Sequence, residues 1–143
     1  MRALYRWGFA VQLTLVVLAS VGAYTGVLPT QATAIPGSDK VGHFFMIGLL
    51  SFFLDGAIAA HESDAALARR DVRVLGARVP LAAAAVLLVA GLEEYLQRLS
   101  PRRDSSIYDY LADVLGVVAL TALSRYLEPV LARALDRGAS SPS

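Results

Sequence analysis

Long apolar runs separated by short charged segments constrain this chain more than any other feature of its sequence. Residues 7–28, 41–60 and 107–126 contain few charged residues. Each is long enough to cross a bilayer, since about 20 helical residues cover about 30 Å of hydrocarbon. Hydrophobic residues make up 56% of the 143 positions, which exceeds the roughly 45–50% of ordinary globular proteins. The pattern therefore predicts an all-α, polytopic membrane protein.

A fourth apolar run, Leu81–Leu92, has only 12 residues and is too short to span a bilayer alone. To cross, a helix starting at Pro80 must continue through Glu93 and Glu94, which places carboxylates at the edge of the hydrocarbon or within it. A re-entrant or buried helix is the alternative. We expect a compact bundle of four transmembrane helices, at about 7–28, 41–60, 80–97 and 107–126.

These four helices form one predicted domain over residues 1–129. The following residues, 130–143, are expected to form a cytoplasmic tail that begins amphipathic and ends disordered in a Gly/Ser/Pro stretch. Residues 61–78 are polar and basic, with a short surface helix expected in their middle. A cleaved signal peptide is the alternative for the first apolar run, but this run exceeds the usual length of about 7–15 residues, which favours a retained helix.

The basic residues select the orientation of the bundle. With both termini in the cytoplasm, the inner segments hold nine basic residues and the outer loops hold four, so the positive-inside rule predicts an N-in, C-in topology. The inner set is Arg2, Arg6, Arg69, Arg70, Arg73, Arg78, Arg125, Arg133 and Arg137. The outer set is Lys40, Arg98, Arg102 and Arg103.

This topology places the polar ends of three helices together on the outer face. The residues concerned are Asp39, Lys40 and His43 on the second helix, Glu94 and Gln97 on the third, and Asp109 and Asp113 on the fourth. The second and fourth helices point their N-termini outward, where unpaired N–H groups and positive dipole ends favour an anion. Arg103 lies in the adjoining loop, so we expect a phosphate or carboxylate ligand.

Structural roles compete with functional ones at most of these positions. Ser106-x-x-Asp109 matches a capping box, Asp39 is placed to cap its helix, and Gly116 suits close helix packing. Asp55 lies towards the cytoplasmic face, where it can reach water or a loop arginine. Asp113 is the hardest to explain structurally, because it lies a turn or more inside an apolar helix, and Glu94 follows it. By contrast, Glu93, Arg98 and Asp104 are treated as background.

The order and spacing of these residues resemble those of the VanZ-like family of small bacterial membrane proteins. The resemblance covers residues 7–126 and rests on four short patterns. They are D-K-x-x-H at Asp39, Lys40 and His43; E-x-x-Q at Glu94 and Gln97; P-x-R at Pro101 and Arg103; and Asp109 followed by Gly116. The chain departs from the family at Asp113, where asparagine is usual.

The resemblance implies a multi-helix protein of the bacterial cytoplasmic (inner) membrane. The founding member of the family is associated with resistance to the glycopeptide teicoplanin, which acts on the cell wall, but the family has no agreed reaction. A lipid-linked cell-wall precursor is therefore an implied partner, beside membrane lipids in general.

Three functional hypotheses follow. The first is a cell-envelope protein whose outer site binds an anionic lipid or a lipid-linked wall intermediate through Asp39, Lys40, Gln97, Arg103 and Asp113. The second is a membrane enzyme in which Glu94, Asp109 or His43 moves protons; a metal version of it would gather Asp39, His43, Glu94, Asp109 and Asp113 around a divalent ion. No cofactor is indicated, and no metal site is assigned. A transporter or channel is least favoured, and a net charge of +1 without a basic arm argues against a nucleic-acid partner.

Overall fold

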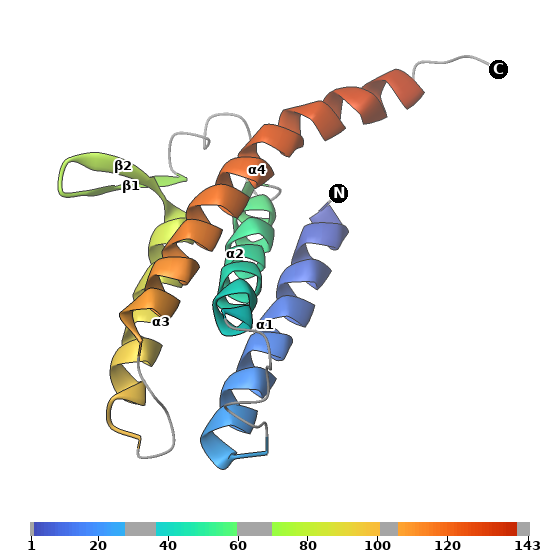
Figure 1. Cartoon of the computed structure of the whole chain (residues 1–143). Helices are drawn as coiled ribbons and strands as arrows, with labels where there is room; N and C mark the ends of the chain where they lie inside the picture. Colours follow the sequence, from blue (N-terminus) through green and yellow to red (C-terminus); the bar gives the residue numbers. More distant parts are fainter. Residues whose placement is uncertain (1, 28–36, 60–69, 101–105, 140–143) are drawn as a thin grey trace.

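The protein is described here from a computed structural model, which covers residues 2–27, 37–59, 70–100 and 106–139 (Figure 1). The elements follow in the order α1 (Arg2–Thr25), α2 (Ser38–Ala59), β1 (Asp71–Val74), β2 (Ala77–Pro80), α3 (Leu81–Gln97) and α4 (Ile107–Ala139). The prediction of a mostly helical chain is confirmed, and a small antiparallel hairpin of β1 and β2 is added to it.

Within the described parts of the chain, three helices are long and apolar enough to cross a membrane. The segments are Ala3–Thr25 of α1, Ser38–Ala59 of α2 and Ile107–Val130 of α4. Large apolar side chains stay exposed on the outside of the bundle, as at Leu18 on α1 and Leu88 on α3. Such surfaces suit lipid better than water, so the helices indicate a membrane protein. At 17 residues, α3 is about 26 Å long.

Two stretches differ from the sequence-based expectation. Helix α4 continues to Ala139, through Pro129. After Pro129 and Val130, residues 131–135 read Leu-Ala-Arg-Ala-Leu, all strong helix formers, which accounts for the continuation past the expected end at 126. Over 71–80 the chain forms a hairpin, because Asp71–Val74 alternates polar and β-branched residues and Leu75-Gly76 supplies the turn. The short surface helix was expected in the middle of 61–78. Residues 61–69 lie outside the described residues, and from Asp71 to Val74 the chain is a strand, so the expectation is wrong there.

Helix α2 lies at the centre of the bundle and packs most closely on α4 (Figure 1). A side chain at Gly48 would meet the carbonyl oxygen of Gly116 at 2.7 Å, and one at Gly116 would collide with the backbone of Phe44. The packing role predicted for Gly116 is thus confirmed, and Gly48 has the same role. Between membrane helices, small residues allow close approach and extensive van der Waals contact. The neighbouring core consists of Leu50, Ala83, Val86 and Val117.

The helices run between two ends of the bundle, each made of different elements. The start of α1, the hairpin and the C-terminal part of α4 lie at one end, which we call the hairpin end (Figure 1). The starts of α2 and α4 and the ends of α1 and α3 lie at the other, which we call the Lys40 end.

Candidate functional site

At the Lys40 end, an ion-pair chain joins the first turns of α2 and α4. Lys40 Nζ lies 2.9 Å from Asp39 Oδ2 and 3.0 Å from Asp109 Oδ1. The Asp109 side chain is 14% exposed, whereas Lys40 and Asp39 are 41% and 53% exposed. Lys40 therefore links the two helix starts while keeping part of its charge accessible.

One turn deeper, His43 pairs with Asp113. The distance from His43 Nδ1 to Asp113 Oδ1 is 3.1 Å, and the Asp113 side chain is only 5% exposed. A buried acid inside an apolar helix needs such a partner. Asp113, the acid inside an apolar helix that the sequence singled out, thus forms with His43 a second polar layer below Lys40 and Asp109.

Glu94 is buried and is directed at the start of α4. Its Oε1 accepts a hydrogen bond of 2.6 Å from the backbone N–H of Ser106, while the carbonyl of Ser106 accepts those of Asp109 and Tyr110. A carboxylate at a helix N-terminus satisfies an unpaired donor and complements the dipole. The spacing Ser106-x-x-Asp109 predicted that Asp109 would accept a hydrogen bond from the backbone N–H of Ser106. In the structure Glu94 of α3 accepts that hydrogen bond instead.

Replacement of Glu94 by alanine should lower the free energy of unfolding by about 1–3 kcal/mol, because the part-buried N–H of Ser106 loses its acceptor. Glu94→Gln keeps an acceptor oxygen and should retain most of the stability. Thermal unfolding in detergent, followed by circular dichroism, measures both. Equal stability of Glu94→Ala and the wild type would contradict the cap.

Glu93 holds a different position, which the sequence-based analysis missed. It accepts hydrogen bonds from Ser20 Oγ, at 3.1 Å, and from Gln97 Nε2. Adjacent helical residues point about 100° apart, so only one glutamate can face α4. The i, i+4 spacing of Glu93 and Gln97 was the signal that could have placed these two on one face.

A cavity of about 340 Å³ lies between α1, α2 and α3. Its lining residues are Leu13, Val16, Val17, Ala19, Ser20, His43, Met46, Ile47, Leu50, Val86, Val89, Ala90, Glu93 and Asp113. The polar members, Ser20, His43, Glu93 and Asp113, all come from the helix portions nearest the Lys40 end. The cavity thus has apolar walls and one polar end, the shape of a site for an amphiphile.

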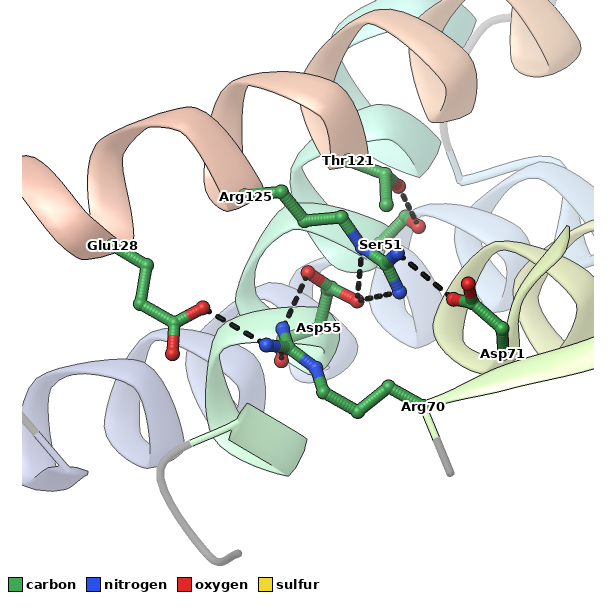
Figure 2. A network of polar contacts seen from close by, with 7 residues as sticks. All are labelled: Ser51, Asp55, Arg70, Asp71, Thr121, Arg125 and Glu128. Atoms are coloured by element: carbon green, nitrogen blue, oxygen red, sulfur yellow. Dashed lines mark hydrogen bonds and ion pairs between the residues drawn. The ribbon is translucent and has the colours of Figure 1, made fainter. Parts of the chain in front are cut away.

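A second polar cluster lies at the hairpin end (Figure 2). Asp55, which is 1% exposed, accepts from Arg70 at 2.8 Å and from Arg125 at 3.3 Å. Arg70 also binds Glu128 at 2.9 Å, and Arg125 binds Asp71 at 2.8 Å. The expectation that Asp55 reaches a loop arginine is confirmed. This network ties the chain before β1 to both α2 and α4.

The structure therefore brings most of the predicted site residues to one end, in separate small groups. Asp39, Lys40 and Asp109 form one group and His43 and Asp113 the next. Glu94 contacts Ser106 at the start of α4, and Gln97 contacts Glu93. Arg103 lies outside the described residues. Within the described ranges, no three His, Asp or Glu side chains are grouped closely enough to hold a metal ion. Comparison of the chain with protein-family models, curated proteins and solved structures finds no match.

Proposed function

We propose that the chain is a VanZ-like protein of the bacterial cytoplasmic membrane that binds a lipid or lipid-linked envelope intermediate in the cavity between α1, α2 and α3. The observation that carries the proposal is the cavity itself, with its apolar walls and a polar end formed by Ser20, His43, Glu93 and Asp113. All four helices span the bilayer, with both termini in the cytoplasm and the Lys40 end outside.

The contacts at the polar end define the ligand's headgroup. Lys40 is partly exposed beside the N-termini of α2 and α4, a combination that favours a phosphate. Deeper in the cavity, Glu93 and Asp113 offer acceptor oxygens to hydroxyl, amide or amine donors. A phospholipid, or a lipid-linked sugar with phosphate and neighbouring hydroxyls, has both kinds of group. Moving the acyl chains of a lipid from the bilayer into the cavity gains little hydrophobic free energy, because both surroundings are apolar. The specificity must therefore come from the polar groups of the cavity and from the shape of its walls.

Blocking the cavity tests this assignment. Ala90 is buried and lines the cavity, whereas Ala85 on the same helix is exposed. A phenyl ring at position 90 would overpack an occupied cavity at a cost of about 1–3 kcal/mol, which corresponds to a roughly 5- to 150-fold loss of affinity for the ligand. Native mass spectrometry of the purified protein should show a copurifying lipid that is lost in Ala90→Phe and kept in Ala85→Phe. Identical lipid content in both variants and the wild type would refute the site.

Accessibility to a membrane-impermeant thiol reagent tests the topology, since the chain has no cysteine of its own. Leu99 follows α3 at the Lys40 end and is 71% exposed, while Leu75 lies at the tip of the hairpin and is fully exposed. In intact spheroplasts, Leu99→Cys should react and Leu75→Cys should react only after permeabilisation. The reverse pattern would invert the orientation, and labelling of both before permeabilisation would remove one crossing.

A membrane enzyme acting on the same ligand is the second candidate. The His43–Asp113 pair favours it, because a carboxylate at Nδ1 leaves Nε2 as the basic nitrogen of the ring. In this version Asp109 or Glu94 would be the other proton-transfer group. Reconstituted wild-type protein would then convert its bound lipid to a new species, and Asp109→Asn or Glu94→Gln would bind the lipid without converting it.

A further inference from the structure

The hairpin of β1 and β2 has one apolar and one polar face. Side chains alternate along a strand, so the cross-strand pairs Val72–Val79 and Val74–Ala77 share one face. The pairs Asp71–Pro80 and Arg73–Arg78 share the other. Val79 packs against the core of the bundle, whereas Val74 is 45% exposed. The apolar face thus begins at the core and extends outward beyond the bundle.

The tip of the hairpin exposes a leucine in an unfavourable backbone conformation. Leu75 and Gly76 form a two-residue turn with φ values of 49° and 85°. Such turns normally contain Asn, Asp or Gly at the first position, because other residues adopt positive φ at a cost. The Leu75 side chain is fully exposed. Folding of the hairpin alone therefore does not account for an apolar residue there.

Arg73 and Arg78 lie directly opposite each other on the polar face. Like charges in this arrangement destabilise a two-stranded sheet. Both side chains are exposed, and neither has an ion-pair or hydrogen-bond partner within the described parts of the chain. An anion bound by both guanidinium groups would remove the repulsion, and a phosphate suits their geometry.

The direction of the hairpin shows what surface it meets. It leaves the start of α3 sideways, across the direction of the helices and away from them (Figure 1). In a bilayer crossed by the helices, a hairpin so directed lies along the lipid surface. Val79 on the apolar face packs against the core of the bundle. If the rest of this face turns to the acyl chains, Arg73 and Arg78 on the opposite face turn to the headgroups.

We propose that the hairpin is an interfacial anchor. Val74 and Leu75 insert at the boundary of the acyl chains, while Arg73 and Arg78 bind the phosphates of anionic phospholipids. The anchor rests on the membrane embedding stated under the proposed function, and it is independent of any ligand in the cavity between α1, α2 and α3.

Tryptophan quenching by brominated lipids tests the anchor in the full-length protein. Trp7 is the only tryptophan, so a Trp7→Phe background allows a single reporter to be placed by Val74→Trp. Leu88→Trp in the same background reports on the exposed surface of α3. The proteins are reconstituted in bilayers that contain phosphatidylcholine or phosphatidylglycerol with brominated acyl chains.

We expect both reporters to be quenched, and the hairpin reporter to be quenched several-fold more effectively by brominated phosphatidylglycerol. Arg73→Gln and Arg78→Gln should each reduce this preference by up to about fivefold, the contribution of one basic residue near an anionic surface. Arg133→Gln, which removes an exposed arginine of α4, should leave the preference of the hairpin reporter unchanged.

The other outcomes overturn the proposal in distinguishable ways. Quenching of Leu88→Trp alone, with the hairpin reporter open to aqueous iodide, would place the hairpin in water. A hairpin reporter shielded from both lipid and iodide would mean that a second copy or another protein covers it. Equal quenching of the hairpin reporter by the two lipids would refute anionic headgroup binding. Failure to quench Leu88→Trp would refute the membrane embedding itself and the anchor with it.

Discussion

Gly116→Ala is expected to lower the free energy of unfolding by about 3 kcal/mol, at the upper end of the usual range for overpacking. The added methyl group would collide with the carbonyl oxygen of Phe44, which belongs to the backbone of α2 and cannot rotate away. Relief requires α2 and α4 to separate. That movement would also stretch the 2.6 Å hydrogen bond between Ser51 and Thr121 in the same interface.

Gly42→Ala is the matched control, because it makes the same change in α2 where an added methyl group meets no atom within 4 Å. Alanine there should raise stability by about 0.5 kcal/mol through its better helix propensity. Thermal unfolding in detergent compares the two. If Gly116→Ala is as stable as Gly42→Ala, the close α2–α4 contact does not exist in the protein.

Asp55→Ala is expected to be the most damaging change at the hairpin end, with a loss of about 3–5 kcal/mol. The cost arises less from the lost attraction than from Arg70, which is itself 5% exposed and would keep a buried charge without its closest acid. In Asp55→Ala, Glu128 still pairs with Arg70 and Asp71 still pairs with Arg125 (Figure 2). The loss of stability should therefore be smaller than for a buried arginine with no remaining acid.

Asp39→Ala provides the control, because it removes an aspartate that is also ion-paired but largely exposed, and should have little effect. The double variant Asp55→Leu/Arg70→Met should recover part of the stability lost in Asp55→Ala, since apolar residues can replace a buried pair. A double variant that is less stable than Asp55→Ala would show that Arg70 stabilises the fold without Asp55.

The helices were predictable because the length of an apolar run is a local property. Their ends were less so: α4 passes through Pro129 because helix formers follow it. The hairpin at 71–80 carried a local signal in its alternating residues and Leu-Gly turn, but the basic character of 61–78 directed attention to a surface helix instead. By length and composition α1, α2 and α4 can cross a membrane. The crossing itself, and the count of four spans that includes α3, remain predictions.

The site was predictable as a set of residues but not as a set of contacts. Depth in each helix placed Lys40, His43, Asp109 and Asp113 at one end, and the structure groups them there. The sequence analysis selected Glu94 as a site residue and treated Glu93 as background. In the structure Glu94 caps α4, and it is Glu93 that lines the cavity. The cavity itself has no signal in the sequence, because its lining residues come from four separate helices, with Asp113 contributed by α4.

Sequence alone thus determined where the chain is apolar, where its charges lie and that three of its helices can cross a membrane. These properties depend only on neighbouring residues and on helix length. The tertiary structure decided which acid meets which base, because each partner is set by the rotation of one helix against another. Asp55 shows the difference most clearly: its position in the second helix was evident, but its burial between Arg70 and Arg125 depends on how three distant segments meet.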